Sequence, residues 1–119
     1  MTTPANALTA ALLIEIPKRF PQCRIWRSNR INATAVNKDG SKRYIKAGID
    51  GQGDLSGITR RNYGFENWVG LRLEIEVKAG RDKQSDAQKG FQKMIQDHGG
   101  IYIVARSVEQ CLEELGRWA

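Results

Sequence analysis

The segment LEIEVKAG, residues 73–80, places three charged side chains at alternate positions of an otherwise apolar run. Successive side chains of a strand point to opposite faces, so Glu74, Glu76 and Lys78 are predicted to share one face, with about 6.6 Å between Glu76 and Lys78 along the strand. The pattern has two interpretations: a solvated strand face with an ion pair, or a catalytic metal site. Such spacing is common on solvated strands, so the segment alone leaves both open.

Asp54 supplies a second carboxylate, 22 residues before Glu76 and at the start of a short predicted strand. If the two strands pair, the two carboxylates converge beside the main-chain carbonyl of Val77. Two carboxylates, a carbonyl and water make a suitable oxygen shell for Mg²⁺. A lysine beside that shell, such as Lys78, can help to deprotonate the attacking water and offset the charge of a phosphate. This combination predicts hydrolysis of a phosphodiester.

Histidine and cysteine are too scarce to offer another kind of metal site, because the chain has one histidine and two cysteines. Cys23 and Cys111 could form one disulfide, but two thiols make neither a disulfide framework nor a zinc site. A metal ion would therefore be held by carboxylates, which favours Mg²⁺, with Mn²⁺ as the alternative. His98, just before Gly99, is predicted to end a helix.

The 119 residues fit a single domain, residues 1–119, with one core. A net charge of +6, from 19 Lys and Arg against 13 Asp and Glu, favours a nucleic acid partner, although such a surplus also serves solubility. No apolar run approaches the ~20 residues needed to cross a bilayer, and the basic residues are not gathered on one amphipathic helix. We expect no membrane association. Since no basic region precedes the first apolar stretch, we also expect no signal peptide and a cytoplasmic or intracellular location.

The elements that must position these residues follow from periodicity and from turn and capping signals. A helix is predicted over residues 7–16, ended by Pro17. Strands are predicted at residues 23–29, 54–59, 68–80 and 101–105, with a hairpin turn at Asp39-Gly40 and a basic turn over residues 60–63. Capping boxes at Ser85–Gln88 and Ser107–Gln110 begin two more helices, predicted to pack through Ala87, Phe91, Met94 and Ile95 and through Val108, Cys111, Leu112 and Leu115. The order indicates a mixed α/β domain.

Four linked segments resemble the VRR-NUC family of the PD-(D/E)XK nuclease superfamily, namely WRSN, GIDGQGDLSG, EIEVKAGRDKQSDAQKGF and GGIYIVARS. They match, in order, that family's W-R-x-N segment, its G-x-x-D approach, its E-V-K-x-G strand with a serine-to-glutamine helix start, and its closing V-x-R-S stretch. Linked motifs are far more specific than one motif. The resemblance implies a restriction-endonuclease-like fold, a mixed β-sheet flanked by helices with an αβββαβ core.

The same resemblance implies the roles of the site residues. Asp54 and Glu76 would be metal ligands together with the Val77 carbonyl, Lys78 would be the catalytic lysine, and Gln88 would be the active-site glutamine at the head of the following helix.

Family members often place a further glutamate on the first helix, and this chain offers Glu15 there. It lies on the predicted apolar stripe, where a charge needs a metal ion or another partner. The family position lies nearer Asn6, so Glu15 is interpreted either as a metal ligand or as a structural glutamate near the helix end.

Seven residues are candidates for DNA contact: Arg27, Asn29, Lys42, Arg43, Lys46, Arg60 and Arg61. The first two are predicted to contact phosphate beside the metal ion, or else to cap a neighbouring loop. The others could grip the DNA backbone through counterion release, and each alone could also be a solvated loop charge. The tryptophans, Trp26, Trp68 and Trp118, are interpreted as packing residues rather than as stacking platforms for bases.

These residues lead us to expect a Mg²⁺-dependent DNA endonuclease. The chain resembles the stand-alone, largely viral branch of the family, which implies action inside a host cell on branched DNA such as Holliday junctions, by a homodimer. A non-catalytic DNA-binding protein that retains the nuclease fold is the alternative, and a partner-binding subunit is a third interpretation.

Overall fold

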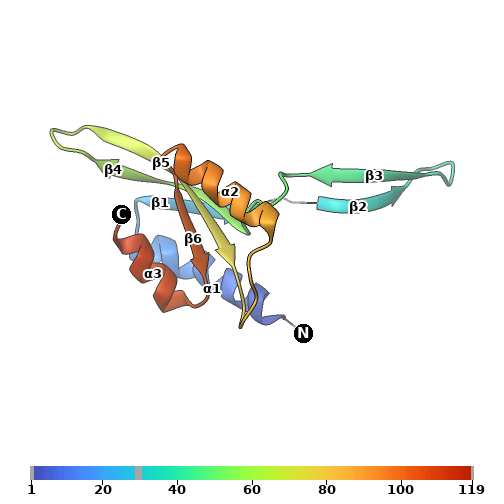
Figure 1. The fold of residues 1–119 in the computed structure, drawn as a ribbon, viewed down its shortest axis with the longest axis horizontal. Coiled ribbons are helices and arrows are strands. Elements are labelled where there is room, and N and C mark those ends of the chain that lie inside the picture. Colours follow the sequence, from blue (N-terminus) through green and yellow to red (C-terminus); the bar gives the residue numbers. More distant parts are fainter. Residues whose placement is uncertain (1, 29–30, 119) are drawn as a thin grey trace.

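The structure, a computed structural model, describes residues 2–28 and 31–118, apart from the side chains of residues 31, 32, 46 and 47. Its elements are α1 (Pro4–Arg19), β1 (Cys23–Arg27), β2 (Ile31–Val36), β3 (Lys42–Ala47), β4 (Leu55–Asn62), β5 (Trp68–Val77), α2 (Asp86–Asp97), β6 (Ile101–Ala105) and α3 (Val108–Gly116). Figure 1 shows them in sequence colours.

The main sheet has four strands in the order β1-β4-β5-β6. The β1/β4 and β4/β5 pairs are antiparallel, whereas β5 and β6 are parallel and joined by a crossover through α2. Strands β2 and β3 form a separate two-stranded sheet. Without that hairpin, the elements from α1 to β6 follow the order αβββαβ, which confirms the predicted mixed α/β class with helices flanking the sheet.

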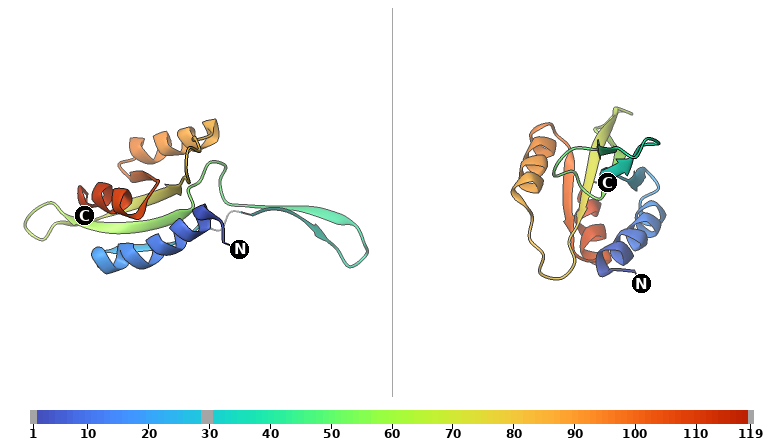
Figure 2. Two further views of the ribbon diagram at one scale, coloured as in Figure 1. Left: turned by 90° about the horizontal axis from the view of Figure 1, so that it is seen from below. Right: turned by 90° about the vertical axis from the view of Figure 1, so that its right-hand side faces the viewer.

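The two faces of the sheet carry different layers, as the right-hand view of Figure 2 shows. Helices α1 and α3 cover one face and form the main core with alternate residues of β5, namely Leu73, Ile75 and Val77. Helix α2 covers the other face with a smaller cluster of Phe91 and Ile95 against Tyr102. The side chains of Glu74 and Glu76 point to the α2 face, and both are fully buried. The solvated-face interpretation of these glutamates is therefore wrong.

Helix α1 is longer than predicted at both ends. It begins with Thr3 as N-cap and Pro4 in its first turn, where proline costs no hydrogen bond. The helix also continues through Pro17, which was predicted to end it. Proline removes only one main-chain donor, and the last turn still closes because the Phe20 N–H donates to the Ile16 carbonyl at 2.7 Å.

The predicted basic turn over residues 60–63 is wrong for its first three residues. Arg60, Arg61 and Asn62 extend β4 and pair with the start of β5, ending with Asn62 opposite Trp68. The reversal lies in residues 63–67, where Gly64, Phe65 and Glu66 have positive φ angles. The β4–β5 ribbon therefore extends beyond the part of the sheet that the helices cover.

The predicted starts of α2 and α3 are confirmed, because both serine caps form reciprocal capping boxes. The buried stripe of α3 also agrees, with Val108 half-buried. In α2, however, Ala87 and Met94 are exposed, since Phe91 and Ile95 are the residues of this helix that pack against Tyr102.

The β2–β3 hairpin projects away from the body, giving extents of 61 × 31 × 26 Å (Figure 1). Its turn is the predicted one: Gly40 has φ 86°, and the Asp39 carboxylate accepts the Ser41 N–H at 2.9 Å. Cys23 and Cys111 are free and buried, so they do not form the disulfide that the sequence allowed.

Candidate functional site

Asp54 lies directly before β4, beside the end of β5. The antiparallel register pairs Leu55 with Ile75, and its extension by one residue places Asp54 opposite Glu76. The Asp54 Oδ2 accepts a hydrogen bond from the Val77 N–H at 2.7 Å. The predicted pairing of the two strands is thus confirmed, and it brings Asp54 to the Glu76–Val77 peptide.

Glu76 is buried without full hydrogen bonding. Its Oε1 accepts the Tyr102 hydroxyl at 3.1 Å, whereas its Oε2 has no hydrogen-bond partner among the described residues. Burial, reinforced by the negative Glu76, raises the pKa of Tyr102 far above its ordinary value of 10.0, so the phenol remains a donor. A buried carboxylate oxygen without a partner is costly, and a bound cation would relieve that cost.

Glu74, on the same face, has a complete set of partners. It accepts hydrogen bonds from the Gly53 N–H at 3.0 Å and the Ser56 hydroxyl at 3.2 Å, and it pairs with Arg72 at 2.9 Å. Burial raises the pKa of Glu74, and Arg72 opposes that rise. This glutamate joins the loop before β4 to the central strand.

A polar cavity of about 310 Å³ lies at this end of the sheet. It brings together three of the predicted site residues, Asp54, Arg27 and Gln88, from three different elements. Its remaining lining consists of Asn6, Thr9, Ser28, Gln52 and Gly53.

The start of α2 is held beside Asp54 by a close main-chain contact. A Cβ atom at Gly51 would lie 2.1 Å from the Ala87 carbonyl oxygen, so only glycine fits there. The capping box then orients Gln88, whose Oε1 accepts the Ser85 N–H at 2.8 Å while the residue lines the cavity. Gln88 therefore serves the helix start and faces the site as well.

Glu15 is not brought to this cavity. It lines a separate one with Arg19 and residues of α3, whereas Asn6 occupies the helix position beside Asp54. Nine residues at about 100° each leave Glu15 on the opposite side of α1 from Asn6 and about 13–14 Å further along it. The helix geometry therefore contradicts the prediction of Glu15 as a metal ligand.

Lys78 directly follows β5 and is half-buried, and its N–H donates to the Ala105 carbonyl at 2.9 Å. It does not line the cavity that holds Asp54. Its catalytic role stays a prediction.

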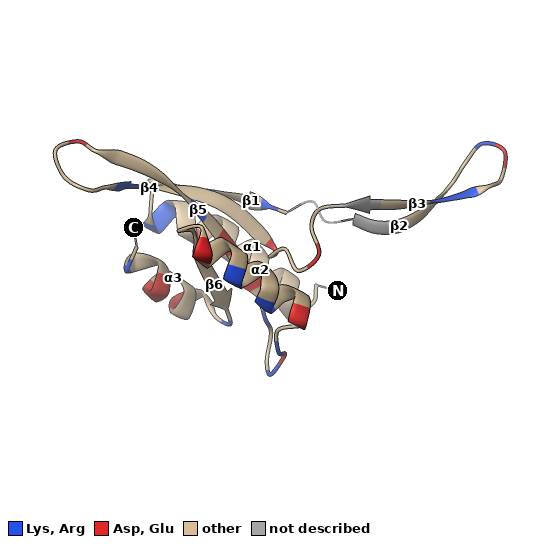
Figure 3. Cartoon of the chain, turned by 45° about the horizontal axis from the view of Figure 1, so that its top comes forward, with Lys and Arg blue, Asp and Glu red and all other residues tan. Residues whose placement is uncertain are grey.

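The candidate DNA-contact residues fall in three places. Arg27 lines the cavity, Lys42 and Arg43 are exposed on the β2–β3 hairpin, and Arg60 and Arg61 lie toward the outer end of β4. Figure 3 shows basic residues on the outer part of that hairpin and near the end of β4. Asn29 and the Lys46 side chain lie outside the described part of the structure.

The donor set at this edge fits a hard divalent cation. Asp54 and Glu76 offer carboxylates, Val77 offers a carbonyl, and the unpartnered Glu76 Oε2 is the oxygen most in need of a cation. Within the described residues, no group of three or more His, Cys, Asp and Glu side chains is placed to hold a metal ion. Two carboxylates remain compatible with Mg²⁺, because this ion usually keeps several waters.

Sequence reasoning missed Tyr102 and the polar lining from α1. The tyrosine had a signal, since it is the one hydroxyl in the apolar strand IYIVA. Asn6 had one too, since the family position on the first helix lies near it, whereas Thr9 had none, because its place depends on how α1 docks beside the start of β4.

Comparisons of the chain with protein-family models, with curated proteins and with solved structures find no match. Among the residues that the structure describes, no helix combines the length and the apolar character needed to cross a bilayer.

Proposed function

We propose that this protein is a Mg²⁺-dependent DNA endonuclease, with Mn²⁺ as a possible substitute, whose centre comprises Asp54 and Glu76. The observation that carries the proposal is the buried Glu76 Oε2, which lacks a partner in the described residues. The strand register sets Asp54 opposite this glutamate. Asp54 lines the polar cavity, whereas the buried Glu76 does not line it and lies behind Asp54 on the neighbouring strand. Two carboxylates on paired strands are suited to binding a cation that also contacts a phosphate.

Each residue has a role that its position supports. Asp54 and Glu76, with the Val77 carbonyl, would hold the cation, which when bound supplies Lewis-acid activation of the phosphate and of water. Arg27 faces the same cavity and can bind a phosphate oxygen of the scissile strand. Gln88 can orient a water or a phosphate from the α2 side.

Lys78 completes the proposed chemistry. In this role its ammonium group balances the charge that develops on the phosphate and orients the attacking water. It must reach the phosphate from the end of β5, where its main chain is fixed to β6.

The net charge of +6 and the basic β2–β3 hairpin favour a nucleic acid substrate. Branched DNA, such as a four-way junction, is the proposed target, and a two-fold symmetric homodimer is the proposed working form. A junction is resolved by two opposed nicks, and a chain with one centre supplies both only as a pair.

A non-catalytic DNA-binding protein is the second candidate. The described chain offers no third acidic ligand at the site, and Lys78 does not line the cavity. Both observations favour a protein that binds DNA through its basic surface and does not cleave it.

Cleavage assays separate the two candidates. Purified protein is incubated with linear, splayed, flap and four-way junction DNA in Mg²⁺, Mn²⁺, Ca²⁺ or EDTA. We expect paired nicks in the junction with Mg²⁺ or Mn²⁺, binding without cleavage in Ca²⁺, and about twice the 13.4 kDa chain mass by light scattering.

Folded Asp54→Asn and Lys78→Ala variants should lose cleavage, whereas the matched Glu109→Gln variant, an exposed acid on α3, should retain it. Binding without cleavage under every condition would favour the non-catalytic candidate. Cleavage by a strict monomer at flaps or free ends alone would exclude the junction proposal and leave the nuclease proposal in place.

A further inference from the structure

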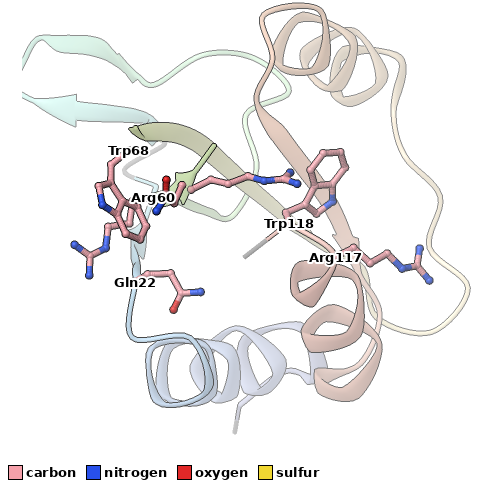
Figure 4. Close-up of a pocket in the computed structure, with 7 residues that line it drawn as sticks. Gln22, Arg60, Trp68, Arg117 and Trp118 are labelled. Atoms are coloured by element: carbon pink, nitrogen blue, oxygen red, sulfur yellow. The ribbon is translucent and has the colours of Figure 1, made fainter. Parts of the chain in front are cut away.

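A second cavity, of about 470 Å³, lies toward the opposite end of β4 from Asp54 (Figure 4). Its lining includes Arg60 and Arg61 of β4, Trp68 at the start of β5, and Arg117 and Trp118 after α3. Arg60 follows Asp54 by six residues, so the extended strand separates the two cavities by about 20 Å.

The tryptophans of this cavity were predicted to be packing residues, and that prediction is wrong. Trp68 is 53% exposed and Trp118 is 46% exposed. Figure 4 shows the two indoles on opposite sides of the cavity, with Gln22 below them. The Arg60 guanidinium lies over the Trp68 ring at 5.0 Å from its centroid, a cation–π contact that holds the indole in place.

The charge of the cavity is positive. Arg60, Arg61 and Arg117 contribute to its lining, and none of the described residues that line it is acidic. Arg117 forms an ion pair with Glu113 at 4.0 Å, but both side chains are exposed, so this pair neutralises little of the charge.

A second contact between an arginine and an aromatic ring lies beside the cavity, at the turn after β4. Arg61 lies over the exposed ring of Tyr63 at 5.3 Å. The outer end of the β4–β5 ribbon is therefore a surface of arginine and aromatic side chains.

We propose that the cavity formed by Arg60, Arg61, Trp68, Arg117 and Trp118 binds an unpaired nucleotide of a single strand. An indole face stacks on the base, and the arginines bind the flanking phosphates. Stacking needs a base free of its duplex neighbours, so the cavity selects single-stranded segments over duplex. An acidic peptide is the weaker alternative, because a peptide does not need two indole faces.

The proposed ligand deepens the proposed function, and its part in cleavage rests on that function. A strand that enters the Asp54 cavity and follows β4 outward reaches the indoles after about 20 Å, the length of about six base pairs. The substrate favoured by this arrangement carries an unpaired segment beside the cut, as branched DNA does.

Binding is measured in EDTA, so that cleavage cannot interfere, by fluorescence anisotropy with a labelled oligothymidine and with a duplex of equal length. Trp68→Ala and Trp118→Ala should each weaken oligothymidine binding by about five- to a hundredfold, with a smaller effect on duplex. The matched control is Trp26→Ala, because Trp26 is 49% exposed on β1 and lies outside the cavity. Arg60→Lys keeps the charge but loses the planar group, so oligothymidine binding should also weaken.

Equal affinity of the wild type and the folded Trp68→Ala and Trp118→Ala variants for oligothymidine would overturn the proposal. An equal loss of single-strand and duplex binding in these variants would also overturn it. A change in the molar mass of the variants without a change in oligothymidine binding would overturn it as well, because the cavity would then be a protein interface. Thymidine monophosphate, added as a competitor, tests whether the ligand is a free nucleotide or part of a strand. If it displaces the labelled oligothymidine as effectively as unlabelled oligothymidine does at the same concentration, the ligand is a free nucleotide and the strand proposal is overturned. Oligothymidine binding is measured without metal and cleavage with it, so failure at this cavity and failure of the nuclease proposal are distinguishable.

Discussion

Glu74 and Glu76 lie two residues apart on the same face of β5, and both side chains are 0% exposed, but their surroundings differ. The Glu74 carboxylate receives a main-chain N–H, a hydroxyl and a guanidinium. The Glu76 carboxylate receives the Tyr102 hydroxyl, and its second oxygen has no partner in the described structure. The two carboxylates are therefore equally buried but differ greatly in how many hydrogen-bond partners they have.

The difference indicates a structural role for Glu74 and supports the proposed chemical role of Glu76. A buried carboxylate with all its partners stabilises the fold and has little capacity left for a ligand. A buried carboxylate with an unsatisfied oxygen lowers stability unless something binds it, and such groups concentrate at functional sites. We therefore expect substitutions of Glu74 and Glu76 to have opposite consequences.

The largest effect is expected from Glu76→Gln. It should lower cleavage by about a hundredfold or more, because the proposed cation ligand is lost. Stability without metal should be unchanged or higher, since a buried charge is removed. Cleavage rates and thermal unfolding measure the two effects.

If the proposed site binds Mg²⁺ in the folded state alone, added Mg²⁺ should raise the melting temperature of the wild type, and this rise should vanish in Glu76→Gln. Glu109→Gln serves as the control. A metal-dependent rise that survives in Glu76→Gln would show that the cation binds elsewhere.

A smaller effect, on stability, is expected from Glu74→Ala. The Gly53 N–H, the Ser56 hydroxyl and Arg72 would lose their acceptor, so the free energy of unfolding should fall by about 2–4 kcal/mol. Urea denaturation measures this change. Glu74→Gln, which keeps the shape of the side chain, should fall by less. If Glu74→Ala is as stable as the wild type, the structural role of Glu74 is refuted.

The smallest effect is the pH dependence that Glu74 contributes. Burial raises its pKa in the folded state above the ordinary value of 4.5, so between these two pKa values the folded state binds more protons than the unfolded state. Stability from this group is then lost as pH rises through that window, and none is lost below the unfolded pKa. Urea denaturation at several pH values should show a less negative slope in Glu74→Gln than in the wild type. Parallel curves would exclude a raised pKa.

Local features were predictable from the sequence because they depend on residues close along the chain. The capping boxes at Ser85 and Ser107 and the Asp39-Gly40 turn need only a few neighbouring residues. The pairing that sets Asp54 opposite Glu76 follows from two strands joined by one reversal. The net charge follows from composition alone.

The partners of the buried and exposed groups were decided only by tertiary structure. The face of α1 that docks against the sheet selects Asn6 and leaves Glu15 on the other side of the helix. The parallel pairing of β6 with β5 brings the Tyr102 hydroxyl to Glu76. The path of the chain after α3 brings Trp118 to the same cavity as Trp68. These contacts join residues far apart in the sequence, and no local pattern specifies how such segments pack.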